Sequence, residues 1–291
     1  MTPSALITLG LSVSLFAIVL ATGMATARRD IGLLAVDPRL LLRSLVSMNV
    51  VAPTIASILA LTLPLDRALA IALVLLAISP VPPTGPGKSL AAGGDRSYVV
   101  SLLALSAMLS IVLVPLSLAI LGKLVELPLA ITPALVARKI AMSILLPLFT
   151  GTFIRAASPA KSERASRVVG ALGAVLLLLC AVPLIVAALP RLWPLVGSGG
   201  IAVIVAYSTF TLLTGHVLGG PSPDNRTVLA LSSTMRHPGI AIVLARANFP
   251  DEPLIVPAML LCLLVSAIVS TTYVRASRQH TTVVAPRAVH H

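Results

Sequence analysis

Two stretches of the chain decide its fold, because each breaks a helix inside an apolar run. Residues 77–90 read Ala-Ile-Ser-Pro-Val-Pro-Pro-Thr-Gly-Pro-Gly-Lys-Ser-Leu, and residues 231–240 read Leu-Ser-Ser-Thr-Met-Arg-His-Pro-Gly-Ile. A proline lacks the backbone donor and clashes with the preceding turn, so neither stretch can form one continuous helix. Interrupted apolar segments in both halves of a chain are typical of the binding site of an inverted-repeat transporter. The alternative is that these stretches are loops between separate short helices.

The sequence around these stretches has the composition of a membrane protein. Of its 291 residues, 57% are hydrophobic and only 10% are charged, with a mean hydropathy of +1.05. Soluble domains carry roughly 25% charged residues, and a helix needs about 20 apolar residues to cross a bilayer. Apolar runs of that length predict an all-α integral membrane protein with about nine transmembrane helices, at residues 4–24, 40–62, 67–93, 97–122, 134–156, 167–189, 197–217, 225–247 and 252–274.

The spacing of the two breaks predicts an internal repeat. Thr84 and Thr234 lie in the breaks, 150 residues apart. The same offset places the counterpart of the span at 134 before Met1, so the first half lacks its first helix. We expect one transmembrane transporter domain over residues 1–276, with four helices in a first repeat at 1–124 and five in a second at 132–276. A complete unit has an odd number of helices, so the second copy is inverted in the membrane.

The 21 lysines and arginines lie mostly in short loops, which argues against a nucleic-acid surface. The predicted topology places thirteen of them on one side of the membrane and six on the other, the six being Arg67, Lys123, Arg138, Lys139, Arg191 and Arg246. Short cytoplasmic loops carry the excess of basic residues. This predicts a multi-pass cell-membrane protein with its N-terminus outside, its C-terminus inside and a disordered cytoplasmic tail at 277–291.

Acidic residues are absent from the middle of every predicted span. All nine fall in loops or at span ends: Asp30, Asp37, Asp66, Asp95, Glu126, Glu163, Asp224, Asp251 and Glu252. Sodium and proton pathways commonly use an intramembrane carboxylate. HExxH, GxSxG and P-loop motifs are also missing, so we predict no enzyme, no cofactor and no metal site.

Lys88 and Arg236 are the two basic residues predicted at depth, one in each broken segment. A charge there costs about 2.5–3.5 kcal/mol on insertion scales and indicates function; the alternative is that either side chain reaches an interface. The N-termini of half-helices also favour anions. Together these features predict an anionic substrate.

Further polar candidates lie beside the breaks. His237 could carry a proton or hydrogen-bond the opened backbone. The others could bind substrate or satisfy freed carbonyls: Thr84, Ser89, Ser232, Ser233, Thr234 and, before Pro53, Asn49.

The order of several segments resembles the bile acid/sodium symporter family. Gly215-His-Val-Leu-Gly-Gly is followed by 224–231 and then by Ser-Thr-Met-Arg-His-Pro-Gly at 233–239, similar to the family's glycine-rich helix end and broken crossing helix. Residues 79–95 resemble its other crossing helix. The resemblance implies a panel domain, a core domain and alternating access around the crossing point. Family members with nine helices, lacking the first, are known.

The resemblance also implies where sodium ligands would lie, and this chain departs from them. The family's sodium-binding Glu falls at Ser232, its Gln at Arg236, its Ser-Asn pair near Gly85 and Pro86, and a further Gln near Met48. We therefore expect a sodium-independent transporter of small organic anions, with Arg236 and Lys88 as fixed cations. The alternatives are a sodium- or proton-coupled symporter of bile-acid-like or other anions, and a non-transporting receptor or structural subunit.

Overall fold

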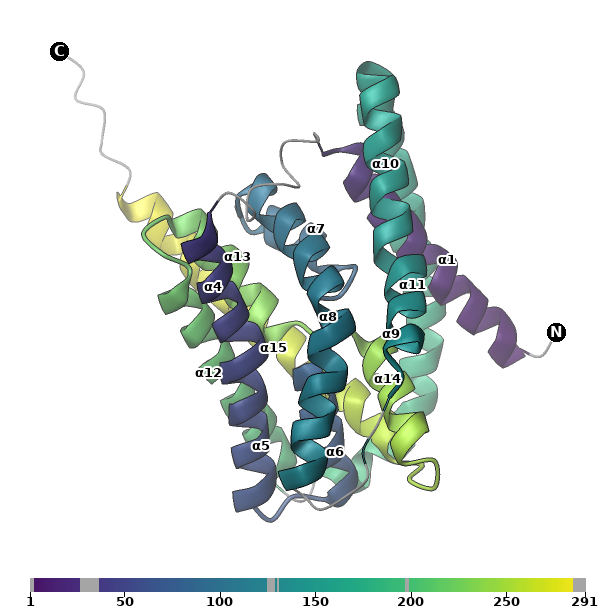
Figure 1. The fold of residues 1–291 in the computed structure, drawn as a ribbon, viewed down its shortest axis with the longest axis vertical. Helices are drawn as coiled ribbons and strands as arrows, with labels where there is room; N and C mark the ends of the chain where they lie inside the picture. Colours follow the sequence, from purple (N-terminus) through teal and green to yellow (C-terminus); the bar gives the residue numbers. More distant parts are fainter. Residues whose placement is uncertain (1–2, 27–36, 125–128, 130, 197–198, 285–291) are drawn as a thin grey trace.

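The computed structural model describes residues 3–26, 37–124, 129, 131–196 and 199–284, and every regular element within them is a helix (Figure 1). The all-α class is confirmed for these residues. In chain order the elements are α1 (Pro3–Met24), α4 (Pro38–Leu45), the π-helix η1 (Val46–Val51), α5 (Ala52–Thr62), α6 (Arg67–Ile78), α7 (Gly85–Ala91), α8 (Arg96–Leu124), α9 (Pro133–Ile140), the π-helix η2 (Ala141–Leu145), α10 (Leu146–Ala157), α11 (Pro159–Val196), α12 (Gly200–Leu218), α13 (Pro223–Thr234), α14 (Pro238–Asn248) and α15 (Ile255–Val284).

Seven helical segments among the described residues are long and apolar enough to cross a membrane: Pro38–Thr62, Arg96–Leu124, Pro133–Ala157, Pro159–Ala187, Gly200–Leu218, Pro223–Asn248 and Ile255–Ser277. Two apolar helices, Leu9–Met24 and Arg67–Ile78, are shorter. All of them overlap the predicted spans. The total of nine crossings, the inverted repeat and the panel and core domains stay predictions.

Prolines widen two of the spans into π-helical turns. The N–H of Ala52, just before Pro53, bonds to the carbonyl of Ser47, five residues back. Leu146, just before Pro147, bonds in the same way to Ala141. A proline has no N–H to donate, and π-turns inside α-helices occur frequently at functional sites. The first of these turns contributes a carbonyl to the site described below.

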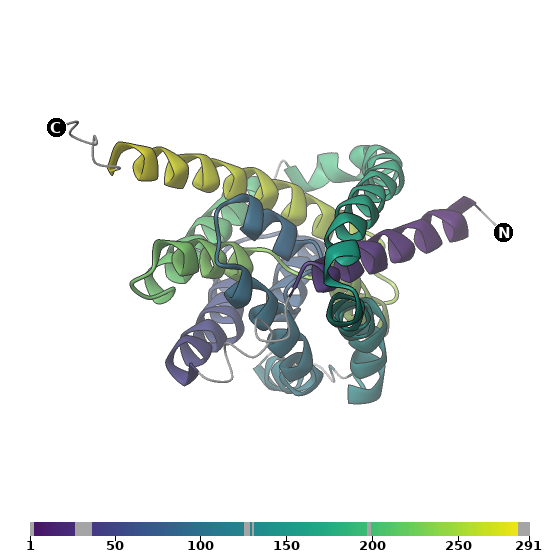
Figure 2. The same ribbon diagram turned by 90° about the horizontal axis from the view of Figure 1, so that it is seen from above.

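Helix α1 packs against α10 and α11 rather than against α4, the next helix in sequence (Figures 1 and 2). A Cβ on Gly23 would collide with the carbonyl oxygen of Leu148, and a Cβ on Gly151 with that of Leu20. Small residues let transmembrane helices approach until their backbones touch. The contact between α1 and α10 therefore requires glycine on both sides.

The remaining helices enclose the two breaks. The first break separates Ile78 at the end of α6 from Gly85 at the start of α7, and the second separates Thr234 from Pro238. All of α13 from Thr227 to Thr234 is buried. At the other end of the chain, α15 continues to Val284, past the predicted start of the tail at residue 277. Residues 285–291 of that tail lie outside the described residues.

Candidate functional site

The two helix breaks meet in the interior. The backbone N–H of His237 donates to the carbonyl of Pro80 at 2.9 Å. The Nη1 of Arg236 donates to the carbonyl of Ser79 at 3.2 Å. Two segments more than 150 residues apart thereby satisfy each other's opened backbone.

Arg236 is buried, with 2% of its surface exposed, and so does not reach an interface. Its Nη2 donates to the carbonyls of Met48 and Ser233, both at 2.9 Å. Three guanidinium N–H groups therefore meet three backbone carbonyls from three different elements: η1, the end of α6 and the end of α13.

Each of these carbonyls is free for a reason visible in the sequence. In the π-helical register of η1, the partner of the Met48 carbonyl would be the nitrogen of Pro53, which carries no hydrogen. Ser79 follows the last residue of α6, and Ser233 lies in the last turn of α13. The last carbonyls of a helix have no partner within it. Arg236 thus fills a cradle of oxygen atoms that would suit a bound cation.

Buried hydroxyl groups join the surrounding helices. Ser233 Oγ lies 2.7 Å from Ser47 Oγ, and Thr234 Oγ1 lies 3.0 Å from Thr211 Oγ1. Ser208 and Ser266 pair in the same way at 2.8 Å. The hydroxyls of Ser233 and Thr234 are engaged within the protein, which supports a structural contribution beside the predicted one in binding.

His237 caps the helix that follows it. Its Nδ1 accepts from the N–H of Gly239 at 3.1 Å, so in the neutral ring the proton sits on Nε2. That Nε2 has no hydrogen-bond partner, although His237 is 1% exposed. Tyr207 Oη and Arg236 Nε are also buried, and these two side chains lie close enough to interact with each other. Unpaired buried polar groups are rare, and His237 Nε2 is one of them.

The other predicted residues are placed differently. Ser232 is buried within α13, and Ser89 is buried within α7. Thr84 and Asn49 are half-buried. Lys88 is exposed, and no described contact joins it to Arg236. The structure therefore brings together Arg236, His237, Ser233 and Thr234 but not Lys88.

Sequence reasoning missed Lys139 and Tyr207. The carbonyl of Lys139 accepts from Ser143 Oγ, and its side chain reaches the start of α14. Its position near the start of the predicted span at 134–156 is typical of a lysine at the membrane interface, so the sequence gives no reason to place it in the site. Tyr207 is a single tyrosine inside an apolar run, and nothing in the sequence indicates that it belongs to the site. Its neighbour in space, Arg236, is distant in sequence.

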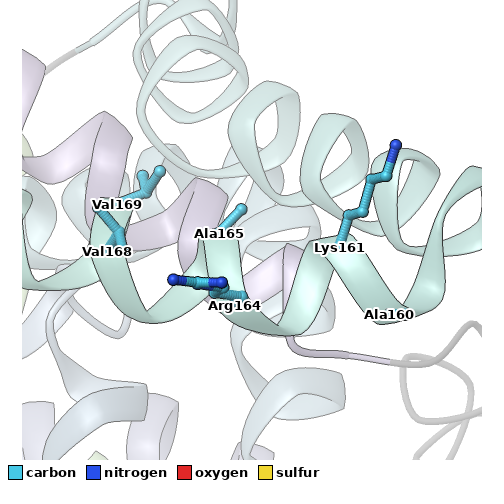
Figure 3. Close-up of a pocket in the computed structure, with 6 residues that line it drawn as sticks. All are labelled: Ala160, Lys161, Arg164, Ala165, Val168 and Val169. Carbon is cyan, nitrogen blue, oxygen red and sulfur yellow. The ribbon is translucent and has the colours of Figure 1, made fainter.

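The two described cavities lie away from this crossing. One, of about 530 Å³, runs along the side of α11, which supplies all of its lining residues; Lys161 and Arg164 are among them (Figure 3). The other, of about 290 Å³, is lined mainly by apolar residues of α5, α6 and α8, with Arg67 among them. Within the described residues, no three His, Cys, Asp or Glu side chains gather as metal ligands would.

The first break and the Met48 carbonyl fall within a region that matches a known family model. Residues 12–191, more than half of the chain, match the sodium bile acid symporter family. The chain belongs to this family. It is accordingly a multi-pass membrane transporter of the bile acid symporter kind. The second break, with Arg236, lies beyond the matched residues. No curated protein matches the chain.

Proposed function

We propose that this symporter family member moves small organic anions by alternating access without requiring sodium. One observation carries the proposal: the buried guanidinium of Arg236 donates to three backbone carbonyls at the crossing of the two breaks. In transporters with broken helices, unwound carbonyls of this kind coordinate sodium. Here a covalently attached cation occupies that place, so no external ion is needed to complete the crossing.

The charge balance of the crossing supports an anionic substrate. Among the residues that the structure describes, no acidic side chain belongs to the cluster around Arg236, and both described ion pairs, Arg67–Glu252 and Arg155–Glu163, lie elsewhere. A guanidinium stays protonated in proteins, and its charge acts over a longer range where the dielectric constant is low. An anion that approaches the crossing would offset this charge, whereas a cation would be repelled.

Flux measurements test both parts of the proposal. The protein in liposomes should take up radiolabelled cholate or benzoate at the same rate in sodium, potassium or choline buffers. Uptake that collapses when sodium is removed would establish sodium coupling instead. Binding of these anions without any flux would identify a receptor.

A further inference from the structure

Lys139 reaches the crossing from a different helix. It lies in the last turn of α9, and its Cε is 3.6 Å from the position that a Cβ on Gly239 would occupy. The Cε1 of His237 lies 3.0 Å from the same position. A lysine stem and an imidazole ring therefore converge on the first turn of α14, which lies beside α9 in Figure 1.

This point has three sources of positive potential. Lys139 contributes an ammonium group, and no acidic side chain of the described residues pairs with it. His237 contributes the unpartnered Nε2–H of a ring that is 1% exposed. The 11-residue helix α14 starts here, and the N-terminal end of a helix dipole favours negative charge. Nothing described at this point supplies the matching anion.

Lys139 is less exposed to solvent than its neighbour Arg138. Arg138 is exposed, whereas Lys139 is half-buried and turned toward the crossing. The aliphatic stem of Lys139 therefore packs against the first turn of α14 and carries the ammonium group to this point. A ligand with a negative group that entered here would meet this ammonium group.

We propose that Lys139 binds the carboxylate, or an equivalent anionic group, of the transported substrate at the start of α14, with His237 Nε2 as a second donor. The proposal rests on the proposed function, since it names the group that recognises the substrate's charge. Arg236 keeps the crossing closed and cationic; Lys139 makes the direct contact. Because Lys139 and His237 belong to different helices, a bound anion joins α9 to α14.

The test uses the full-length protein in nanodiscs and two radiolabelled probes, cholate and benzoate, each compared with its uncharged methyl ester. Lys139→Met should weaken binding of the anion about tenfold or more, as expected for loss of a charged hydrogen bond. Lys139→Arg should retain most of the affinity. Arg138→Met, a change of the same kind one residue away, should leave it unchanged. Binding of the methyl esters should be the same in all variants.

The outcomes separate the two proposals. If the wild type prefers the anions to their esters but Lys139→Met behaves like Arg138→Met, Lys139 does not bind the anion and the proposed function stands. An equal loss of anion and ester affinity in Lys139→Met would show a packing effect and also overturn the assignment. If the wild type binds neither anion better than its ester, the proposed function fails and the assignment fails with it. Melting temperatures of all variants verify that the compared proteins are folded.

Discussion

The guanidinium of Arg236 donates to the carbonyl oxygen of Met48 at 2.9 Å, across 188 residues of sequence. Together with its bonds to Ser79 and Ser233, this contact joins both helix breaks and the π-helical turn before Pro53 through one side chain. The crossing is therefore held by a cation that cannot dissociate. Removing this cation should therefore change both the stability of the protein and its response to sodium.

Arg236→Ala should convert a sodium-insensitive protein into a sodium-responsive one. The substitution leaves three buried carbonyls unpaired, at a cost of about 1–3 kcal/mol for each group that finds no water, so the melting temperature should fall. The same oxygens are then open to an ion. Sodium, but not choline, should raise the melting temperature of the variant by mass action. The melting temperature of the wild type should be the same in both salts. An unchanged melting temperature in Arg236→Ala, or an equal response of both proteins to sodium, would contradict this account.

The hydroxyl pair Ser47–Ser233 should contribute a measurable coupling energy. Hydrogen bonds between transmembrane helices average about 0.6 kcal/mol and reach about 1.7 kcal/mol in double-mutant cycles. A cycle of Ser47→Ala and Ser233→Ala, followed by denaturation in mixed micelles, should give coupling in that range. Ser110, whose hydroxyl bonds within its own helix to Ala107, provides the control. The effects of Ser47→Ala and Ser110→Ala on the unfolding free energy should be additive. Equal coupling energies in both cycles would show that Ser47 and Ser233 make no specific contact.

Gly151→Ala should destabilise the protein because its new methyl group meets the backbone of α1. A Cβ there collides with the carbonyl of Leu20 and approaches the nitrogen of Met24 to 2.7 Å. Overpacking of this kind typically costs about 1–3 kcal/mol. The matched change is Gly87→Ala in α7, where nothing lies within 4 Å of the added atom. Thermal unfolding should show a lower midpoint for Gly151→Ala only; similar midpoints for both variants would refute the close backbone contact.

The nine predicted spans place the two termini on opposite sides of the membrane, and the excess of basic residues on one side predicts that the C-terminus is the cytoplasmic one. After replacement of Cys180 and Cys262, single cysteines introduced near each end would be treated with an impermeant thiol reagent in intact cells. Only the N-terminal cysteine should react before permeabilisation. Labelling of both ends from the same side would require an even number of crossings.

The sequence predicts the two breaks because proline and glycine act locally, and it places Arg236 at depth because the residue lies far from either end of its span. It does not predict which groups Arg236 contacts. That depends on the Met48 carbonyl, which is freed by Pro53 in a span about 180 residues earlier. The pattern around Pro53 indicates Asn49 instead, which is half-buried in the structure.

Lys139 illustrates a second reason for the difference. Its position near the start of a span is typical of a lysine at the membrane interface. The hydrophobic periodicity of the span does not indicate that its side chain points into the protein. Its contact with the first turn of α14 depends on how α9 and α14 pack, and 100 residues separate Lys139 from Gly239. Lys88 is the opposite case, a residue that the sequence places in the site and the structure does not. It lies in a broken segment, as the site does, but α7 presents it at the surface.

The close packing of α1 against α10 at Gly23 and Gly151 has a consequence for biosynthesis. Its partners α10 and α11 begin at Leu146 and Pro159, more than 120 residues after α1 ends at Met24. Ribosomes add roughly 5–20 residues per second, so on the order of ten seconds pass between the synthesis of α1 and that of the helices that cover it. Throughout that interval Gly23 lacks the backbone of α10 against which it packs in the folded protein. The contact of α1 with these two helices therefore forms only after more than a third of the chain has been made.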